Sequence, residues 1–279
     1  MSALADLSDL VNRLTGGNSG TPEHPFVYFD NRVASAAAAA TVAGRYTSLW
    51  QYNKAASTRG SAPGAVAAPT EATTGALPFT DPGGGRQKWL LGCSALSSAI
   101  GSFILYDRLL HISGLDGTNT GAQTVGGTLT RNTGGVGNQI WVEIYTQIGT
   151  SGTTIAASYT DNDGNSGQTS QAASIGGTGL REAQRIIPIP LADGDIGVRA
   201  VASVTLAGST GTAGDFGITV ARPIAMLTIP LGGIMSTIDF LTNIPALPEL
   251  VANSCLALAW MAQGTGAPQG MVHYQMVEA

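Results

Sequence analysis

From residue 89 onward, the chain consists of short apolar segments separated by turns rich in glycine, aspartate and asparagine. Residues 140–148 and 198–206 alternate with a period of two, as half-buried strands do. Roughly nine to twelve short strands at such intervals predict a mainly β fold, an antiparallel β-sandwich of the jelly-roll kind. No fixed repeat period is present, which excludes solenoids and propellers.

Three of these segments carry more specific expectations. Pro188 and Pro190 predict an edge strand over residues 186–191, because proline cannot donate a ladder hydrogen bond. Residues 256–262 and 271–277, joined by a loop with glycine and proline, are predicted to form a closing hairpin. In the segment 198–206, one face is expected to hold Val198, Ala200, Ala202, Val204 and Leu206.

The first 88 residues differ from this β pattern. Residues 1–17 predict a short amphipathic helix, with Leu7 and Leu10 among its apolar positions. An alanine-rich segment follows at 34–43 and favours helix by propensity. Residues 55–87 contain four prolines and a glycine triplet, which predict an extended arm without regular structure. We therefore expect residues 1–88 to form the helix, the alanine-rich segment and the arm, and residues 89–279 to form the β-sandwich body.

Charged residues make up only 11% of the chain, against about 25% in an average soluble protein. Lys54 and Lys88 are the only lysines, and the net charge is −5. A surface so poor in charge is expected to be covered by other subunits. A nucleic-acid binder needs a basic stripe, and a membrane-surface protein needs a basic amphipathic helix. Neither partner is expected here.

Two further features weigh against a secreted or membrane protein. Cys93 and Cys255 lie in apolar segments and are expected to be buried and unpaired, because two cysteines form no disulfide framework. No signal peptide is recognisable. Residues 89–106 carry no charge over 18 positions, but Ser97 and Ser98 interrupt them, so two buried strands joined by a turn are favoured over a membrane span.

No pattern of catalytic or cofactor-binding residues is present. His24, His111 and His273 are spread over the chain, and their spacing does not predict that they meet. There is no lipase-type nucleophile elbow, and neither lysine follows a glycine as a phosphate-binding loop requires. We therefore expect no enzymatic activity, and we assign no catalytic, cofactor-binding or metal-binding residue.

One turn allows two interpretations. The residues from Asp161 to Asn165 alternate oxygen-bearing side chains around Gly164, as the start of a calcium loop does. The twelfth position from Asp161 is Ala172, where such a loop needs a bidentate glutamate. An Asx-rich hairpin turn explains the same residues and is the preferred interpretation.

Carbohydrate binding by a Thr/Ser-rich β surface is a further alternative. Its usual signature is a set of aromatic side chains that stack on sugar rings, and aromatics make up only 6% of this chain. The four tryptophans lie in apolar segments and are expected to anchor the core or an interface.

Two stretches resemble proteins encoded by tailed bacteriophages and prophages. The first is FILYDRLLHISGL at 103–115 with AQTV at 122–125, and the second runs from SVTL at 203–206 through TGTAGDFG at 210–217. The resemblance extends over about residues 40–275 and carries no catalytic residues. It implies a structural component of the virion.

The resemblance and the low charge together predict an auxiliary capsid protein, of the kind that decorates or cements the shell. Its expected partners are copies of itself and the major capsid protein, within a symmetric particle assembled in the cytoplasm of the bacterial host. A tail, collar or fibre component, with or without glycan binding, is the alternative. Residues 1–17 and 55–87 are the expected inter-subunit contacts.

Overall fold

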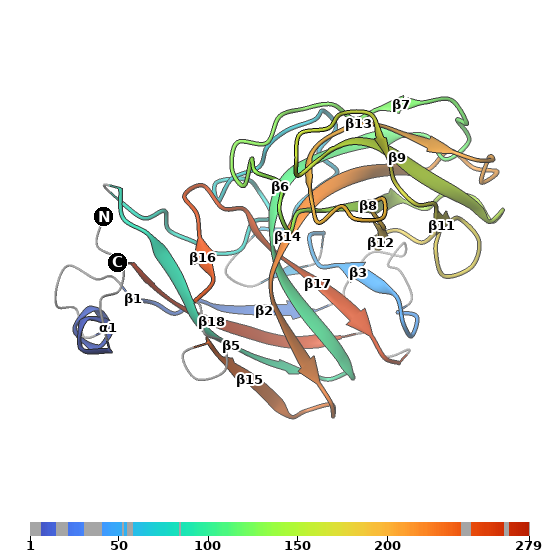
Figure 1. Ribbon diagram of the computed structural model, residues 1–279. Coiled ribbons are helices and arrows are strands. Elements are labelled where there is room, and N and C mark those ends of the chain that lie inside the picture. Colours follow the sequence, from blue (N-terminus) through green and yellow to red (C-terminus); the bar gives the residue numbers. More distant parts are fainter. Residues whose placement is uncertain are drawn as a thin grey trace.

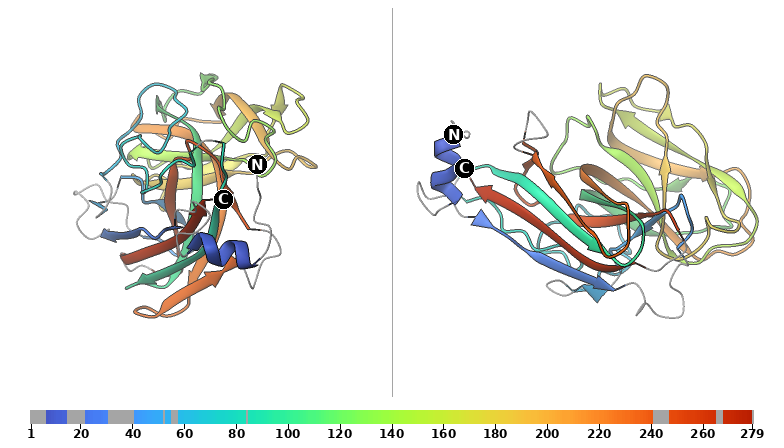
Figure 2. Two further views of the ribbon diagram at one scale, coloured as in Figure 1. Left: turned by 90° about the vertical axis from the view of Figure 1, so that its left-hand side faces the viewer. Right: turned by 90° about the horizontal axis from the view of Figure 1, so that it is seen from below.

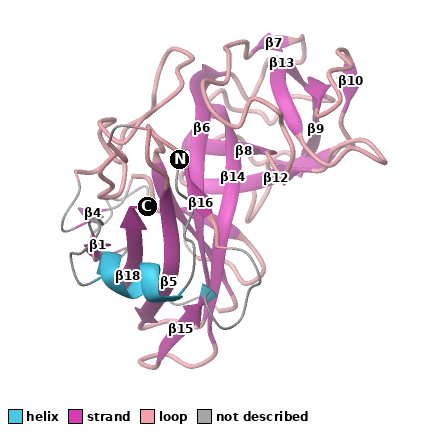
Figure 3. Cartoon of the chain, turned by 60° about the vertical axis from the view of Figure 1, so that its left-hand side comes forward, coloured by secondary structure: helices cyan, strands magenta, loops and turns pink. Residues whose placement is uncertain are grey.

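Antiparallel strands account for most of the chain in the computed structural model, which describes residues 7–14, 22–30, 41–51, 53–54, 58–83, 85–240, 247–264 and 268–278. All described strand pairs are antiparallel, and one helix, α1 (Leu7–Leu14), precedes them (Figure 3). The predicted fold class, a mainly β chain with sandwich-like packing of its sheets and an N-terminal helix, is confirmed.

The centre of the molecule is a closed barrel. Around the barrel the strands follow in the order β12 (Arg185–Ile189), β3 (Tyr46–Ser48), β17 (Leu256–Ala262), β6 (Gly101–Leu115), β14 (Asp215–Ile229) and β8 (Gln139–Thr146). The 15-residue strands β6 and β14 pair with each other along most of their length. They run from the end of the molecule that holds β9 and β13 to the end that holds β15 (Figure 1). Both ends of the molecule are therefore built on the same two strands.

A seven-stranded sheet packs against one end of the barrel wall. It consists of β15 (Met235–Asp239), β5 (Lys88–Ser97), β18 (Gln269–Glu278), β2 (Phe26–Asp30) and β4 (Asn53–Lys54), with β1 (Pro22–Glu23) beside β18 and β16 (Glu249–Leu250) beside β5. The core between them includes Phe103, whose ring centroid lies 4.7 Å from that of Trp260. Helix α1 lies beside the end of β18 (Figure 2), and its Leu10 packs on Leu91 and Val277.

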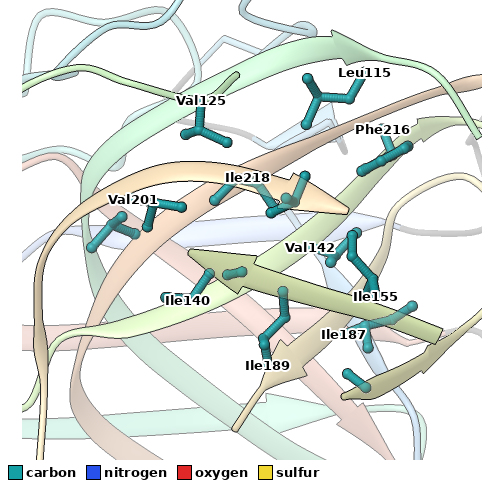
Figure 4. Packing of buried hydrophobic residues seen from close by; sticks show 14 of the residues in the cluster. Leu115, Val125, Ile140, Val142, Ile155, Ile187, Ile189, Val201, Phe216 and Ile218 are labelled. Carbon is teal, nitrogen blue, oxygen red and sulfur yellow. The ribbon is translucent and has the colours of Figure 1, made fainter. Parts of the chain in front are cut away.

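A five-stranded sheet covers the other end of the barrel. It contains β10 (Gln168–Thr169), β9 (Thr153–Asp161), β13 (Val198–Leu206), β7 (Gln123–Thr124) and β11 (Ala173–Ile175). Ile140 and Val142 of β8 point away from the barrel interior and pack with Ile155 and Val201 of this sheet (Figure 4). The odd-numbered residues of β8 therefore face the barrel interior.

Several predicted elements are present. Residues 89–106 form most of β5, the turn at 98–100 and the start of β6, and no helix among the described residues is long and apolar enough to cross a membrane. Helix α1 occupies the middle of the predicted 1–17 segment. Most of the alanine-rich segment 34–43 lies outside the described residues.

The predicted closing hairpin is wrong. Strand β17 pairs with β3 and β6 in the barrel, whereas β18 pairs with β2 and β5 in the seven-stranded sheet. Both strands contribute apolar side chains to one core, where Leu258 and Trp260 of β17 face the layer of Val272 and Tyr274. They lie opposite each other across this core and are not hydrogen-bonded neighbours.

The predicted face of β13 is also wrong in part. Two register shifts, between Val198 and Ala200 and between Val201 and Ser203, rotate the strand. Its buried residues are consequently Val198, Val201, Val204 and Leu206, while Ala202 is exposed. A strict period of two cannot anticipate these bulges.

Residues 58–83 and 85–87 are irregular, as predicted, but they lie against the chain's own body. The Leu77 amide donates to the Leu256 carbonyl at 2.8 Å, and the Tyr274 hydroxyl donates to the Pro78 carbonyl at 2.6 Å. Leu77 and Phe79 belong to the core between the barrel and the seven-stranded sheet. This part of the predicted arm is therefore needed by its own fold, and only its exposed residues are available to a partner.

Candidate functional site

The barrel interior holds a buried ion pair. Arg108 of β6 and Glu143 of β8 are fully shielded from solvent, with Arg108 Nη2 2.6 Å from Glu143 Oε2. The hydroxyls of Ser48, Thr219 and Tyr145 donate to the same carboxylate at 2.6, 2.9 and 3.1 Å. Burial raises the pKa of Glu143, but the Arg108 guanidinium and these donors outweigh burial and hold the pKa below its ordinary value. The carboxylate stays ionised, and both of its oxygens accept hydrogen bonds from the protein.

Arg108 has partners on its other sides as well. Its Nη2 donates to the Tyr145 hydroxyl at 2.6 Å, and its Nε donates to His111 Nδ1 at 2.8 Å. Its guanidinium lies 4.5 Å from the ring of Trp50. Burial, together with the Arg108 charge, lowers the pKa of His111 to about 3, so the imidazole is neutral at physiological pH.

A second buried pair joins β6 to the chain segments around it. Arg131 donates to both carboxylate oxygens of Asp107, from Nε at 2.8 Å and from Nη2 at 2.7 Å. The Cys255 amide donates to Asp107 Oδ1 at 2.9 Å, which holds the start of β17 beside β6. Neither ion pair is predicted from the sequence. Their signal was the presence of Asp107, Arg108 and Glu143 at strand positions between apolar residues.

Of the other residues singled out from the sequence, His111, Trp50 and Cys255 lie at these buried pairs and the rest do not. His24 and His273 lie together, with ring centroids 6.2 Å apart, and His273 stacks on Phe26 at 4.2 Å. His111 lies apart from them, beside Arg108. Cys93 and Cys255 are buried and unpaired, as predicted, and burial raises the pKa of Cys93 to about 12. Trp50, Trp141 and Trp260 are buried in the core, and Trp89 is half-buried.

The turn after β9 has the geometry of an Asx turn. Asp161 Oδ1 accepts hydrogen bonds from the amides of Asp163 and Asn165 at 2.8 and 2.9 Å, and Oδ2 accepts from Asn165 Nδ2 at 2.8 Å. Both carboxylate oxygens of Asp161 therefore accept hydrogen bonds within the turn. Within the described part of the chain, no group of three His, Cys, Asp or Glu residues is placed to hold a metal ion.

The barrel opens to solvent at the end opposite Trp50 and His111. The opening, which we call the mouth cleft, has a volume of about 360 Å³. It is lined by Tyr46, Ile104, Gln139, Trp141, Ile186, Pro188 and residues 223–226. Two adjoining depressions of about 450 and 290 Å³ share Pro188 with it. Among the described residues, Arg45 and Asp195 are the only charged ones that line the three depressions. The concave surface is thus mainly apolar and carries little charge, and the mouth cleft itself is lined by no charged residue among those described.

Two strands are left open on one side at this cleft. Strand β8 pairs with β14 only as far as Ala221, so the following residues of β14 have β6 on one side and no described strand on the other. Strand β12 pairs with β8 through Ile189, but with β3 only through Arg185 and Ile186. The predicted edge strand is thus an edge only over its second half, where Pro188 lies. Both open edges border the depressions around Pro188.

Comparisons with known proteins identify no family for the chain. No family model matches it, and no curated protein matches it significantly. Among solved structures, it is similar to the infectious bursal disease virus VP2 subviral particle at 9% identity and a TM-score of 0.19, over 92% of this chain and 80% of that chain. A structure of the Gt strain of the same virus matches at 15% identity and a TM-score of 0.14, over 81% of this chain and 44% of that chain. Likeness at these TM-scores carries no inference about function, which rests on the residues of the chain itself.

Proposed function

We propose that this chain is a non-enzymatic structural protein of a tailed-bacteriophage virion, and specifically an auxiliary capsid protein that stabilises the shell by binding neighbouring subunits. The supporting observation is a contrast between two sites. The ionisable groups of Arg108, Glu143 and Tyr145 are closed off from solvent and bonded to one another. The open concave surface at the barrel mouth is apolar and almost uncharged. Such a surface favours docking over acid–base chemistry.

The composition supports the same proposal. With 11% charged residues, the chain has few side chains that would keep its surface hydrated as a free monomer. Large apolar side chains are exposed at several places, including Met226 at 56% and Ile196 at 63% near the cleft. In a symmetric shell these positions would be covered by neighbouring subunits. The phage assignment is supported by the resemblance of residues 103–125 and 203–217.

The mechanism is mechanical. Each contact between the chain and a neighbouring subunit removes apolar surface from water, and a specific interface needs roughly 1,000 Å² or more. Repetition of the contact over the shell multiplies its effect, because a subunit that is held at several points dissociates only when all of them release. The shell is thereby made more resistant to the pressure of the packaged genome.

A tail, collar or fibre component is the second candidate. A glycan-binding version of this role needs exposed aromatic side chains for stacking on sugars. Of the described aromatic side chains, only Phe26 is exposed, at 60%. The observations therefore favour contacts with protein over contacts with sugar.

Quantitative mass spectrometry of purified virions tests the proposal. The copy number of this chain is measured relative to the major capsid protein. On the order of hundreds of copies supports the auxiliary capsid role, whereas about six or twelve copies would assign the chain to the collar or tail and overturn that role. Absence from purified particles would contradict a virion function altogether.

A further inference from the structure

We propose that the mouth cleft binds an extended, uncharged segment of a partner protein by strand addition to the open edge of β14. The inference deepens the proposed function, on which it rests for the partner's identity as a neighbouring subunit. It states the chemistry of the ligand: a β-strand with its main chain paired to β14 and an apolar side chain in the cleft. The open backbone and the apolar pocket lie side by side, and both are needed.

The main-chain half of the site is the segment of β14 that follows Ala221. Register with β6 continues to Ile229, while the register with β8 ends at Ala221. At the far end, Ser236 Oγ donates to the Thr228 carbonyl at 2.5 Å, so β15 approaches there. The open stretch is therefore Arg222–Leu227. Unpaired amides and carbonyls on such an edge bind an added strand whatever its sequence.

The edge is limited in ways that suit one specific partner. Pro223 removes one donor, and the register shift between Pro223 and Ala225 bends the strand. Both features protect an edge against indiscriminate pairing. Residues 224–227 stay paired with β6, so only every second amide of this segment points away from β6 and is available to a ligand that enters the cleft.

The side-chain half of the site is the pocket next to this edge. Met226 is 56% exposed, and its cross-strand partner Ile104 lies on the same face. Trp141 forms another part of the wall, with its indole fixed because Nε1 donates to Gln139 Oε1 at 2.9 Å. A strand paired with β14 places alternate side chains on this face. An apolar side chain of the ligand would be buried here, and a charged one would lose its hydration without a partner.

The concave shape favours a single extended segment over a second copy of the chain. Edge-to-edge pairing of two copies requires a surface that is complementary to itself. Here the β14 edge borders a cleft whose opposite wall includes Ile186 and Pro188 of β12. A second copy would have to match this recess with its own recess, whereas a single strand adds to the β14 edge at about 4.8 Å and needs no such match.

The proposal is tested by titrating the full-length ¹⁵N-labelled chain with capped seven-residue peptides. The peptides alternate threonine with Val, Ile, Leu or Met. One control peptide carries N-methyl groups on alternate residues, which abolishes main-chain donation, and another alternates Lys with Glu. The protein variants are Met226→Asp in the cleft and Met271→Asp, a matched control at a methionine that is 43% exposed on the seven-stranded sheet.

We expect the apolar peptides to shift the amide resonances of residues 224–228 at up to millimolar concentration. N-methylation, charge alternation and Met226→Asp should each weaken binding by about tenfold or more, while Met271→Asp should leave it unchanged. Equal binding of the N-methylated peptide, shifts confined to other strands, or no binding by any peptide would overturn the proposal. So would dimerisation of the chain that protects the same amides.

The outcome is separable from that of the proposed function. Peptide binding at β14 by a chain that is absent from purified virions would refute the virion role and leave strand addition intact. If the chain is present in virions but no peptide shifts its β14 amide resonances, strand addition is refuted and the virion role stands.

Discussion

Arg108 and Glu143 form an ion pair in the centre of the barrel, with Nη2 and Oε2 2.6 Å apart and neither side chain exposed to solvent. The pair joins β6 to β8, which are not neighbours in the barrel but are both bonded to β14. The pair therefore links the two strands on either side of β14. Replacing both charges by apolar groups is often tolerated in such pairs, whereas removing one leaves an uncompensated buried charge.

Arg108→Met should therefore destabilise the protein by about 3–5 kcal/mol, because it leaves the Glu143 carboxylate buried without its cation. The double variant Arg108→Met, Glu143→Leu should lose less than the single variant. Urea unfolding of both variants measures the difference. A double variant less stable than Arg108→Met would show that the pair itself is a net source of stability.

Stability should fall as pH decreases from about 6.5 towards 3. The folded pKa of His111 is about 3, below its ordinary value of 6.5, so in this window the unfolded state binds a proton that the folded state does not. The slope from one such group is at most about 1.4 kcal/mol per pH unit. Below about pH 4.5, Glu143 adds to the loss, because its pKa is lowered on folding and the unfolded chain therefore binds a proton that the folded carboxylate does not.

His111→Gln removes that titration and should flatten the slope between pH 6.5 and 5. His273→Gln is the control. The pKa of His273 is lowered by partial burial and by His24, but its imidazole is only half-buried, so a smaller effect is expected. The slopes of both variants are obtained from the midpoints of urea unfolding at several pH values. An unchanged slope in His111→Gln would mean that another group dominates acid sensitivity.

The irregular segment should prove essential to the fold. Leu77 is 1% exposed in the core, so Leu77→Ala should cost about 2–5 kcal/mol. Val66→Ala, at a position 37% exposed in the same segment, should change the free energy of unfolding by less than about 0.5 kcal/mol. Equal effects in urea unfolding would mean that the segment is detachable after all.

Gly60 should resist substitution. A Cβ at this position would lie 2.3 Å from Trp50 Nε1. The Trp50 ring cannot simply withdraw, because it also lies against the Arg108 guanidinium. Gly60→Ala should thus cost about 1–3 kcal/mol through overpacking. Gly152→Ala, where a Cβ meets nothing within 4 Å, should be close to neutral. Thermal unfolding of the two variants decides, and a neutral Gly60→Ala would show that Trp50 can move.

The strands could be predicted from the sequence, but their neighbours could not. Alternation and turn residues located β8 and β13 closely, because those signals are local. The pairing of β17 with β6 depends on a core shared with distant segments, and nothing in residues 256–277 records it. The mouth cleft was out of reach for the same reason, since its lining comes from five strands of the barrel. Only the charges within apolar strands, at Asp107, Arg108 and Glu143, hinted at the polar interior.

On the proposal made above, the mouth cleft docks this chain onto neighbouring subunits of a virion. The most direct test is the amount of Met226→Asp chain retained in purified particles, measured by mass spectrometry against the major capsid protein. Thr205→Asp, at an exposed polar position of β13, is the control. We predict wild-type retention for Thr205→Asp and a loss of about tenfold or more for Met226→Asp. Wild-type retention of Met226→Asp, in a variant that unfolds at the same urea concentration as the wild type, would contradict the account.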